Sequence, residues 1–330
     1  MYKVTLIGGG TGSYTILTGL KNYPDLDIAA IVAMTDDGGS TGVLRDELGA
    51  LPPGDTRQCL VALSESAKIW RQLFNFRFAE GRLRGQNFGN LFITALQQIT
   101  GDFEKSLALA ADLLQANGQV IPVTLDDVRL IAMTDDGQKI IGESNIDLKD
   151  TQVSKILFQP EPSPNPKAIA RILNSDLLVI CPGDIYTSIL PNILVRSMGS
   201  AFRDSRALKV YICNIMTQPF HTQGFKVIDF INILEQYLGK DIFDFVVYNT
   251  QKPDEAFLQS YLSEGEFFVE YDEKELTGRK TVFLGREILS QKIPQKVEGD
   301  LLKRALIRHD PIETAAILYS LLVANSKKEH

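Results

Sequence analysis

The sequence predicts an α/β fold with a doubly wound, largely parallel sheet, helices on both faces and a small antiparallel β excursion. Short apolar runs such as Val4–Ile7 and Ile28–Met34 alternate with stretches of helical periodicity. Glycine-rich or polar turns follow these runs, which is typical of strand–turn–helix units. The chain has 330 residues, 44% of them apolar, and can therefore build a large core without a disulfide or a metal.

The first sixty residues show this alternation most clearly. A strand over Val4–Ile7, a turn over Gly8–Gly12 and a helix that ends near Leu20 open a Rossmann-like unit. The second strand, Ile28–Met34, should pair in parallel with the first through a right-handed crossover. Helical periodicity then dominates residues 56–117.

Residues of about 120–160 have a different pattern. Val128–Met133 and Lys139–Gly142 flank Asp136-Gly137, which predicts an antiparallel hairpin. The proline-rich segment Gln159–Pro166 ends this excursion. We expect one α/β domain over residues 1–330, with the β-rich excursion inside it.

The strand and helix alternation returns after Pro166. Strands are expected at Leu177–Cys181, Lys209–Cys213 and Phe245–Tyr248, and helices at Asn192–Ala201 and Ile312–Ala324. Asp310 is placed to cap the last helix, with Pro311 at its first position.

Composition and charge exclude several classes of protein. The 34 Lys and Arg against 41 Asp and Glu give a formal charge of −7, which argues against nucleic acid or an anionic membrane as the main partner. The three cysteines form no C-x-x-C pair, so neither a zinc cage nor a disulfide framework is indicated. No apolar run of 18 residues predicts a membrane span, and the N-terminal residues lack a signal-peptide pattern. We expect a soluble, cytoplasmic protein.

The pentapeptide Met-Thr-Asp-Asp-Gly occurs twice, at Met34–Gly38 and at Met133–Gly137. The first copy ends a predicted parallel strand, and ligands of such sheets lie beyond the carboxyl ends of the strands. The second copy lies between two hairpin strands, where Asp-Gly favours a turn. Ligand chemistry is therefore expected only at the first copy.

The turn Gly8–Gly12 has two interpretations. Its amides and the following helix N-terminus could hold a phosphate, or it is a tight turn without a ligand. It departs from G-x-G-x-x-G, which would need glycine at Ser13 or Thr15, and no Gly-Lys-Ser/Thr triplet follows. Asp36 is placed like the ribose-binding acid of dinucleotide folds, so an NAD(P)-dependent oxidoreductase remains the weakest of the alternatives.

Asp37 and Asp55 both lie in glycine-rich segments that form turns. They could hold a hard cation such as Mg²⁺ beside a diphosphate, or Asp55 caps its helix and Asp37 fills a turn. Spacing alone favours the structural roles. No Ser-His-Asp or Cys-His arrangement supports a covalent mechanism, and His221 is either a base or a solvated loop residue.

Together these motifs resemble the YvcK-type gluconeogenesis factors, which share a superfamily with CofD, the 2-phospho-L-lactate transferase. The resemblance covers nearly the whole chain. Its segments are Gly8–Gly12, Thr35–Gly42, Leu51–Leu60, Asn87–Leu91, Pro182–Asn192, Cys213–Pro219 and Arg308–Pro311.

The resemblance implies a cytoplasmic bacterial regulator that binds a UDP-sugar, typically UDP-N-acetylglucosamine. It also implies a role in cell shape and wall-precursor supply on gluconeogenic carbon sources, and a link to glucosamine-6-phosphate synthase. The transferase cousin implies Mg²⁺ at Asp37 and Asp55 and is the alternative function. No catalytic residue is assigned, and homo-oligomer formation stays open.

On this hypothesis the glycine loop holds the diphosphate, polar side chains hold the sugar or ribose hydroxyls, and Arg308 reaches the phosphates or the uracil. The expected ligand-binding residues are Gly8, Gly9, Gly10, Thr11, Gly12, Asp36, Asn90, Gly183, Asn214, Thr217, Gln218 and Arg308. Ser13-Tyr14, Asp184 and Phe220-His221-Thr222 depart from the usual family pattern. At Asp184 a carboxylate would repel a diphosphate unless a cation lies between them.

Overall fold

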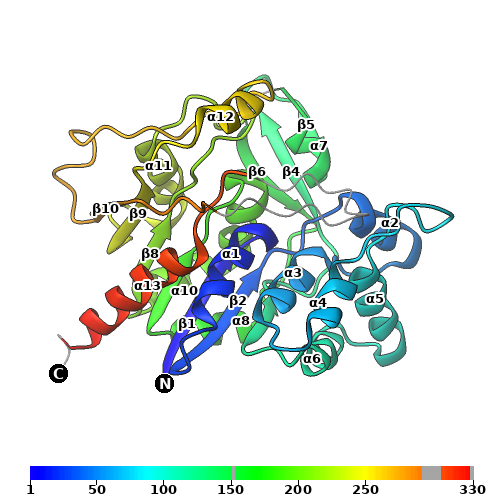
Figure 1. Ribbon diagram of the computed structural model, residues 1–330. Helices are drawn as coiled ribbons and strands as arrows, with labels where there is room; N and C mark the ends of the chain where they lie inside the picture. The colour runs from blue at the N-terminus through cyan, green and yellow to red at the C-terminus, as the bar shows by residue number, and fades with distance from the viewer. Residues whose placement is uncertain (151–152, 292–305, 328–330) are drawn as a thin grey trace.

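A parallel seven-stranded sheet forms the centre of the computed structural model, which describes residues 1–150, 153–291 and 306–327 (Figure 1). Its strand order is β10-β9-β8-β7-β1-β2-β3. The strands are β1 (Tyr2–Gly8), β2 (Leu26–Val32), β3 (Gln119–Pro122), β7 (Leu177–Ile180), β8 (Leu208–Ile212), β9 (Phe245–Asn249) and β10 (Val282–Arg286). Every neighbouring pair is parallel, as the sequence predicts.

Helices cover both faces of this sheet because its strands are apolar on both sides. Val4 and Leu6 of β1 contact one helical layer, whereas Ile7 contacts the other. The first layer consists of α1 (Gly10–Leu20), α3 (Gly54–Leu63) and α13 (Pro311–Ser326). The second consists of α8 (Pro166–Leu173), α9 (Leu190–Leu194), α10 (Met198–Asp204) and α11 (Val227–Leu238). The doubly wound prediction is confirmed.

Residues 56–117 are helical, as expected, and form an apolar cluster of their own around Phe74 and Ile93. This part of the chain contains α3, α4 (Lys68–Asn75), α5 (Phe88–Thr100) and α6 (Phe103–Leu114), and α2 (Gly39–Leu48) precedes them. Two further helical elements, η1 (Ile185–Ile189) and α12 (Glu255–Leu262), follow β7 and β9.

The antiparallel excursion is a three-stranded sheet of order β5-β4-β6. It comprises β4 (Arg129–Thr134), β5 (Lys139–Ile141) and β6 (Val153–Gln159), with the short helix α7 (Glu143–Asp147) after β5. The predicted Asp136-Gly137 turn joins β4 to β5, with φ +82° at Gly137. Tyr186 and Leu194 pack against its apolar side. Because β3 belongs to the large sheet, the antiparallel part begins at Arg129.

Two predicted helices have different outcomes. Residues 192–201 form parts of two helices, α9 and α10, because the backbone leaves the helical region between them and Ser197 adopts φ +66°. The final helix starts as expected: Asp310 accepts hydrogen bonds from the amides of Ile312 and Glu313, and Pro311 occupies the first turn.

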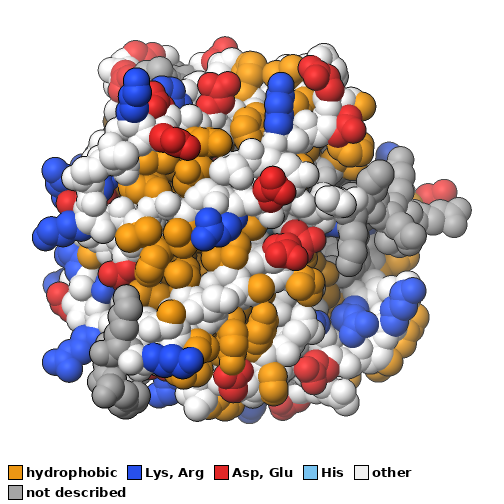
Figure 2. Space-filling view, turned by 60° about the vertical axis from the view of Figure 1, so that its left-hand side comes forward, with side chains coloured by type: hydrophobic (Ala, Val, Ile, Leu, Met, Phe, Trp, Pro, Cys, Tyr) orange, Lys and Arg blue, Asp and Glu red, His pale blue; other side chains and the backbone are white. Residues whose placement is uncertain are grey.

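Basic and acidic side chains are interspersed on the face drawn in Figure 2, in keeping with the small net charge. Among the described residues, no helix is both long enough and apolar enough to cross a membrane.

Candidate functional site

The candidate site lies at the switch point of the large sheet, where the strand order reverses between β1 and β7. The loops that follow these two strands diverge to opposite faces, which leaves a crevice at the carboxyl ends of the strands. A cavity of about 520 Å³ opens there. Gly9–Gly12 lines it from β1 and Pro182–Asp184 from β7.

The glycine loop needs its glycines for close packing. A Cβ on Gly12 would lie 1.7 Å from the Pro182 carbonyl oxygen, and one on Gly10 would lie 2.6 Å from an Asp55 carboxylate oxygen. The N-cap of α1, Gly9, has no side chain to bond the first amides of the helix. These amides therefore face the cavity with the positive end of the helix dipole. Gly8 instead packs against Cys181 and is outside the cavity lining.

Three carboxylates, those of Asp36, Asp55 and Glu143, gather around this loop. Burial raises the pKa of Asp55 to about 7, helped by the charge of Asp36, although a hydrogen bond from the Gly10 amide opposes the shift. Burial also raises the pKa of Asp36. The pKa of Glu143 is raised well above its usual value by burial and then by the charges of Asp36 and Asp55.

This cluster determines which ligands the cavity accepts. A diphosphate at the N-terminus of α1 would meet the Asp55 carboxylate, so either a proton or a cation must separate the two negative charges. Carboxylate oxygens suit a hard divalent cation such as Mg²⁺. The carboxylates of Asp36 and Asp55 line the same cavity and their charges interact, so these two donors fit a magnesium ion, whereas the resemblance implies Asp37 in place of Asp36.

Asp37 points elsewhere. Its carboxylate accepts hydrogen bonds from the amides of Glu143 (3.1 Å) and Ser144 (2.9 Å), and Arg129 approaches to 3.7 Å. It thus holds the first turn of α7 and is not among the described residues that line the cavity. Metal binding by Asp37 together with Asp55 therefore stays a prediction. The aspartate that lines the cavity together with Asp55 is Asp36. Asp55 does not cap α3, because that helix begins at Gly54.

Some of the other predicted ligand-binding residues line the cavity, and the rest make structural contacts outside it. Asn214 joins the loops after β7 and β8: its Oδ1 accepts from the Gly183 amide (3.0 Å) and its Nδ2 donates to the Gly183 carbonyl (2.8 Å). Both line the cavity, together with Thr11, Gln218 and Arg308.

Two predicted residues have structural contacts instead. The Thr217 hydroxyl accepts from the Phe267 amide at 2.9 Å, and the buried Asn90 side chain accepts from Arg57 Nε at 2.8 Å. Neither is among the described residues that line the cavity.

Two acids of the cavity were not predicted from the sequence, and both lie on α7, the helix that follows the β4–β5 hairpin. Glu143 and Asp147 reach the cavity from α7, and the pKa of Asp147 is raised to about 7 by withdrawal from water and by the charge of Asp184. No local motif marks them. His309 also lines the cavity, but burial lowers its pKa to about 4, so it is neutral at pH 7 and its Nε2 donates to the Cys213 carbonyl at 3.0 Å.

Comparison with known proteins places this geometry in a family. Residues 4–289 match the family model described as 2-phospho-L-lactate transferase CofD. The gluconeogenesis factor of Bacillus subtilis is 38% identical over 97% of this chain and 98% of the relative. That of Listeria innocua is 36% identical over 99% of this chain and 98% of the relative.

A solved structure agrees with the fold. The crystal structure of a UPF0052 family member from Bacillus halodurans has a TM-score of 0.89 and 33% identity, and the match covers 96% of this chain and 98% of that one. A long family match, closely similar relatives and a shared fold all agree. The chain belongs to the gluconeogenesis factors of the CofD-like family.

Proposed function

We propose that this protein binds a nucleoside-diphosphate sugar, UDP-N-acetylglucosamine, at the sheet switch point and acts as a regulator. The observation that carries the proposal is the α1 N-terminus, whose glycine loop opens on a cavity of about 520 Å³. The loop amides supply donors for a diphosphate. Gln218 and Arg308, on another wall, supply polar groups for the sugar, ribose or base.

Charge makes this binding dependent on a cation. Burial, and then the charge of a neighbouring aspartate, raises the pKa of Asp55 and of Asp36, so the cavity disfavours further negative charge where the diphosphate would lie. A Mg²⁺ ion on these two carboxylates would link them to the phosphates. The relatives are named gluconeogenesis factors. The role proposed here is that implied by the resemblance: sensing a wall precursor during gluconeogenic growth, with glucosamine-6-phosphate synthase as the expected protein partner.

Isothermal titration with UDP-N-acetylglucosamine, with and without Mg²⁺ and with NADP as comparison, tests the proposal. We expect saturable one-to-one binding that Mg²⁺ strengthens, no consumption of the ligand and weaker binding of NADP. Gln218→Glu puts a carboxylate into the cavity and should weaken binding at least about tenfold. Gln223→Glu adds the same charge at an exposed position of the same loop and should leave affinity unchanged. Absence of binding at millimolar ligand would contradict the proposal.

The CofD family match over residues 4–289 favours a second candidate, a Mg²⁺-dependent transferase of the 2-phospho-L-lactate type. In it the metal would neutralise the leaving diphosphate. Its assay is product formation from an activated phospholactate donor and a deazaflavin alcohol. Product that disappears in Asp55→Asn would establish this candidate, whereas product formed equally by Asp55→Asn and Asp37→Asn would remove the proposed metal role.

A further inference from the structure

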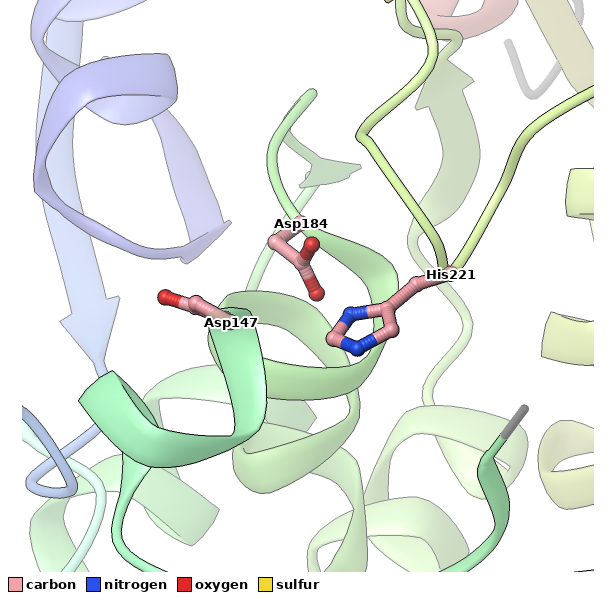
Figure 3. A group of neighbouring side chains, drawn as sticks. All are labelled: Asp147, Asp184 and His221. Atoms are coloured by element: carbon pink, nitrogen blue, oxygen red, sulfur yellow. The ribbon is translucent and has the colours of Figure 1, made fainter. Parts of the chain in front are cut away.

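Three side chains that are distant in sequence meet on one wall of the cavity (Figure 3). Asp147 ends α7, Asp184 precedes η1, and His221 lies in the loop after β8. Their ligand atoms all lie within 4.8 Å of one another. The Asp184 carboxylate and the His221 imidazole face one another, with Asp147 beside them. None of the three was among the predicted binding residues.

His221 is the most informative member of this group. Its side chain belongs to a residue that is only 7% exposed, and its Nε2 has no hydrogen-bond partner among the described residues. A buried ring nitrogen without a partner is unfavourable, because it has lost its hydrogen bond to water and gained none in return. His309 shows the ordinary alternative, because its Nε2 is bonded to the Cys213 carbonyl. The unpartnered nitrogen of His221 therefore indicates a missing ligand.

The two carboxylates also lack a positive partner. Both amides that Asp184 caps, those of Tyr186 and Thr187, donate to Oδ1, which leaves Oδ2 toward the cavity. Within the described ranges, no ion pair joins Asp147 or Asp184 to a basic side chain. Two carboxylates and an imidazole nitrogen therefore converge at one place on the cavity wall.

We propose that Asp147, Asp184 and His221 bind a first-row transition-metal dication of the Zn²⁺ or Mn²⁺ type. Atoms bound at about 2.1 Å to one ion lie up to about 4.2 Å apart, so side-chain shifts of about an ångström complete the site. Asp147 is only partly withdrawn from water, so its side chain can turn to make this shift. An imidazole nitrogen selects such metals over Mg²⁺ and Ca²⁺, which prefer oxygen ligands alone. The site thus differs in chemistry from the oxygen-only pair Asp36 and Asp55.

The test is a Zn²⁺ titration of the full chain without nucleotide, in millimolar Mg²⁺ so that oxygen-only sites are already filled. The chain has three histidines, so ¹⁵N-histidine NMR identifies the responding imidazole. We expect the His221 resonance to shift at one equivalent of Zn²⁺. Calorimetry should show about 100-fold weaker binding in His221→Ala and at least about tenfold in Asp184→Asn and Asp147→Asn.

Glu266→Gln is the matched control, because it removes a carboxylate that lines the same cavity outside the triad. It should retain the wild-type affinity for Zn²⁺. Equal losses in Glu266→Gln and Asp184→Asn, or wild-type affinity in His221→Ala, would overturn the proposal. His221→Gln keeps a polar side chain and serves if the alanine variant unfolds. Because no nucleotide is present, failure of UDP-sugar binding would leave this result intact.

Discussion

The two copies of Met-Thr-Asp-Asp-Gly, Met34–Gly38 and Met133–Gly137, have the same residues and opposite environments. The first copy follows β2 and enters the cavity at the centre of the molecule. The second forms the tip of the β4–β5 hairpin, on the surface. Identical residues therefore become a polar cavity wall in one place and a turn in the other, because the flanking strands determine what surrounds them.

The pKa values of aspartates in the two copies shift in opposite directions. Burial raises the pKa of Asp36 in the first copy. In the second, hydrogen bonds from the Thr134 hydroxyl and from Gln138 lower the pKa of Asp136. The first aspartate of the buried copy thus has a raised pKa, whereas the second aspartate of the hairpin copy has a lowered pKa at an exposed turn.

The two copies are also connected in space. Asp37 of the first copy accepts hydrogen bonds from the amides of Glu143 and Ser144, at the start of the helix that follows the second copy's hairpin. The first copy thereby fixes α7, which carries two of the cavity acids. This contact explains why an aspartate outside the cavity lining still matters to the site.

Substituting a glycine by alanine should give the largest difference in stability loss between the two copies. A Cβ on Gly42 would lie 2.2 Å from the Asp37 carbonyl oxygen, so Gly42→Ala forces the backbone of the first copy to move. We expect a loss of about 3 kcal/mol in the free energy of unfolding, measured by urea denaturation. Gly137→Ala meets no atom within 4 Å but keeps φ +82°, and should lose about 1 kcal/mol. Equal losses would show that the first copy is not closely packed.

Removing the second aspartate of each copy should give a smaller contrast. Asp37→Ala deletes an acceptor of two amide hydrogen bonds on a side chain that is 11% exposed, and we expect a loss of about 2 kcal/mol. Asp136→Ala should change stability by less than about 0.5 kcal/mol, because its side chain lies at an exposed turn and only its bond from the Thr134 hydroxyl is partly buried. Thermal unfolding without added metal measures both. If Asp37→Ala left the stability unchanged, the role of Asp37 in holding α7 would be refuted.

The smallest expected effect is a pH dependence. An unfolded Asp55 titrates near 3.8 and the folded one near 7, so the folded state binds the extra proton and stability falls as pH rises through 7. Between pH 6.5 and 8, Asp55 should account for roughly 1 kcal/mol of this loss. Below pH 6.5 His309 opposes the trend, because its imidazole stays neutral in the folded state down to about pH 4 whereas the unfolded state takes up a proton near 6.5, so stability falls as pH falls.

Unfolding curves at pH 6.5 and pH 8 check this dependence. Asp55→Asn should reduce this slope, and the remainder is expected from Asp147, whose pKa is also raised to about 7. Asp136→Asn should leave the slope unchanged, since a lowered pKa keeps Asp136 ionised in both states across this window. A slope as steep in Asp55→Asn as in the wild type would assign the dependence to other groups.

Local patterns in the sequence predicted much of the fold. Apolar runs located β1, β2, β7, β8 and β9, and the Asp-Gly turn located the β4–β5 hairpin. β10 was missed because its residues are only partly buried and lack a continuous apolar run. β3 was assigned to the excursion because its membership of the large sheet depends on pairing with β2, which no local pattern records.

The site was predictable where it follows the strand ends. Gly9–Gly12, Asp36 and Gly183 were expected at the carboxyl ends of strands, and Asp55 was expected from its glycine-rich turn before a helix; the cavity is lined by all of them. Glu143, Asp147 and His221 were not, because their positions depend on how the excursion and a loop pack against the large sheet. Tertiary packing of this kind leaves no periodic signal in the sequence.

One feature of the sheet bears on how the protein forms during synthesis. β1 is synthesised long before its partner strand β7, which lies about 175 residues later in the chain. Pro311, at the start of α13, packs directly on Gly19 of α1: a Cβ on Gly19 would lie 1.9 Å from the Pro311 carbonyl oxygen. The glycine loop lies between β1 and α1, so the elements that surround it are all present only after most of the chain has left the ribosome. Such long-range pairing predicts that the binding-competent state forms slowly and late. Until β7 has been synthesised, the nascent chain is expected to expose apolar residues of β1.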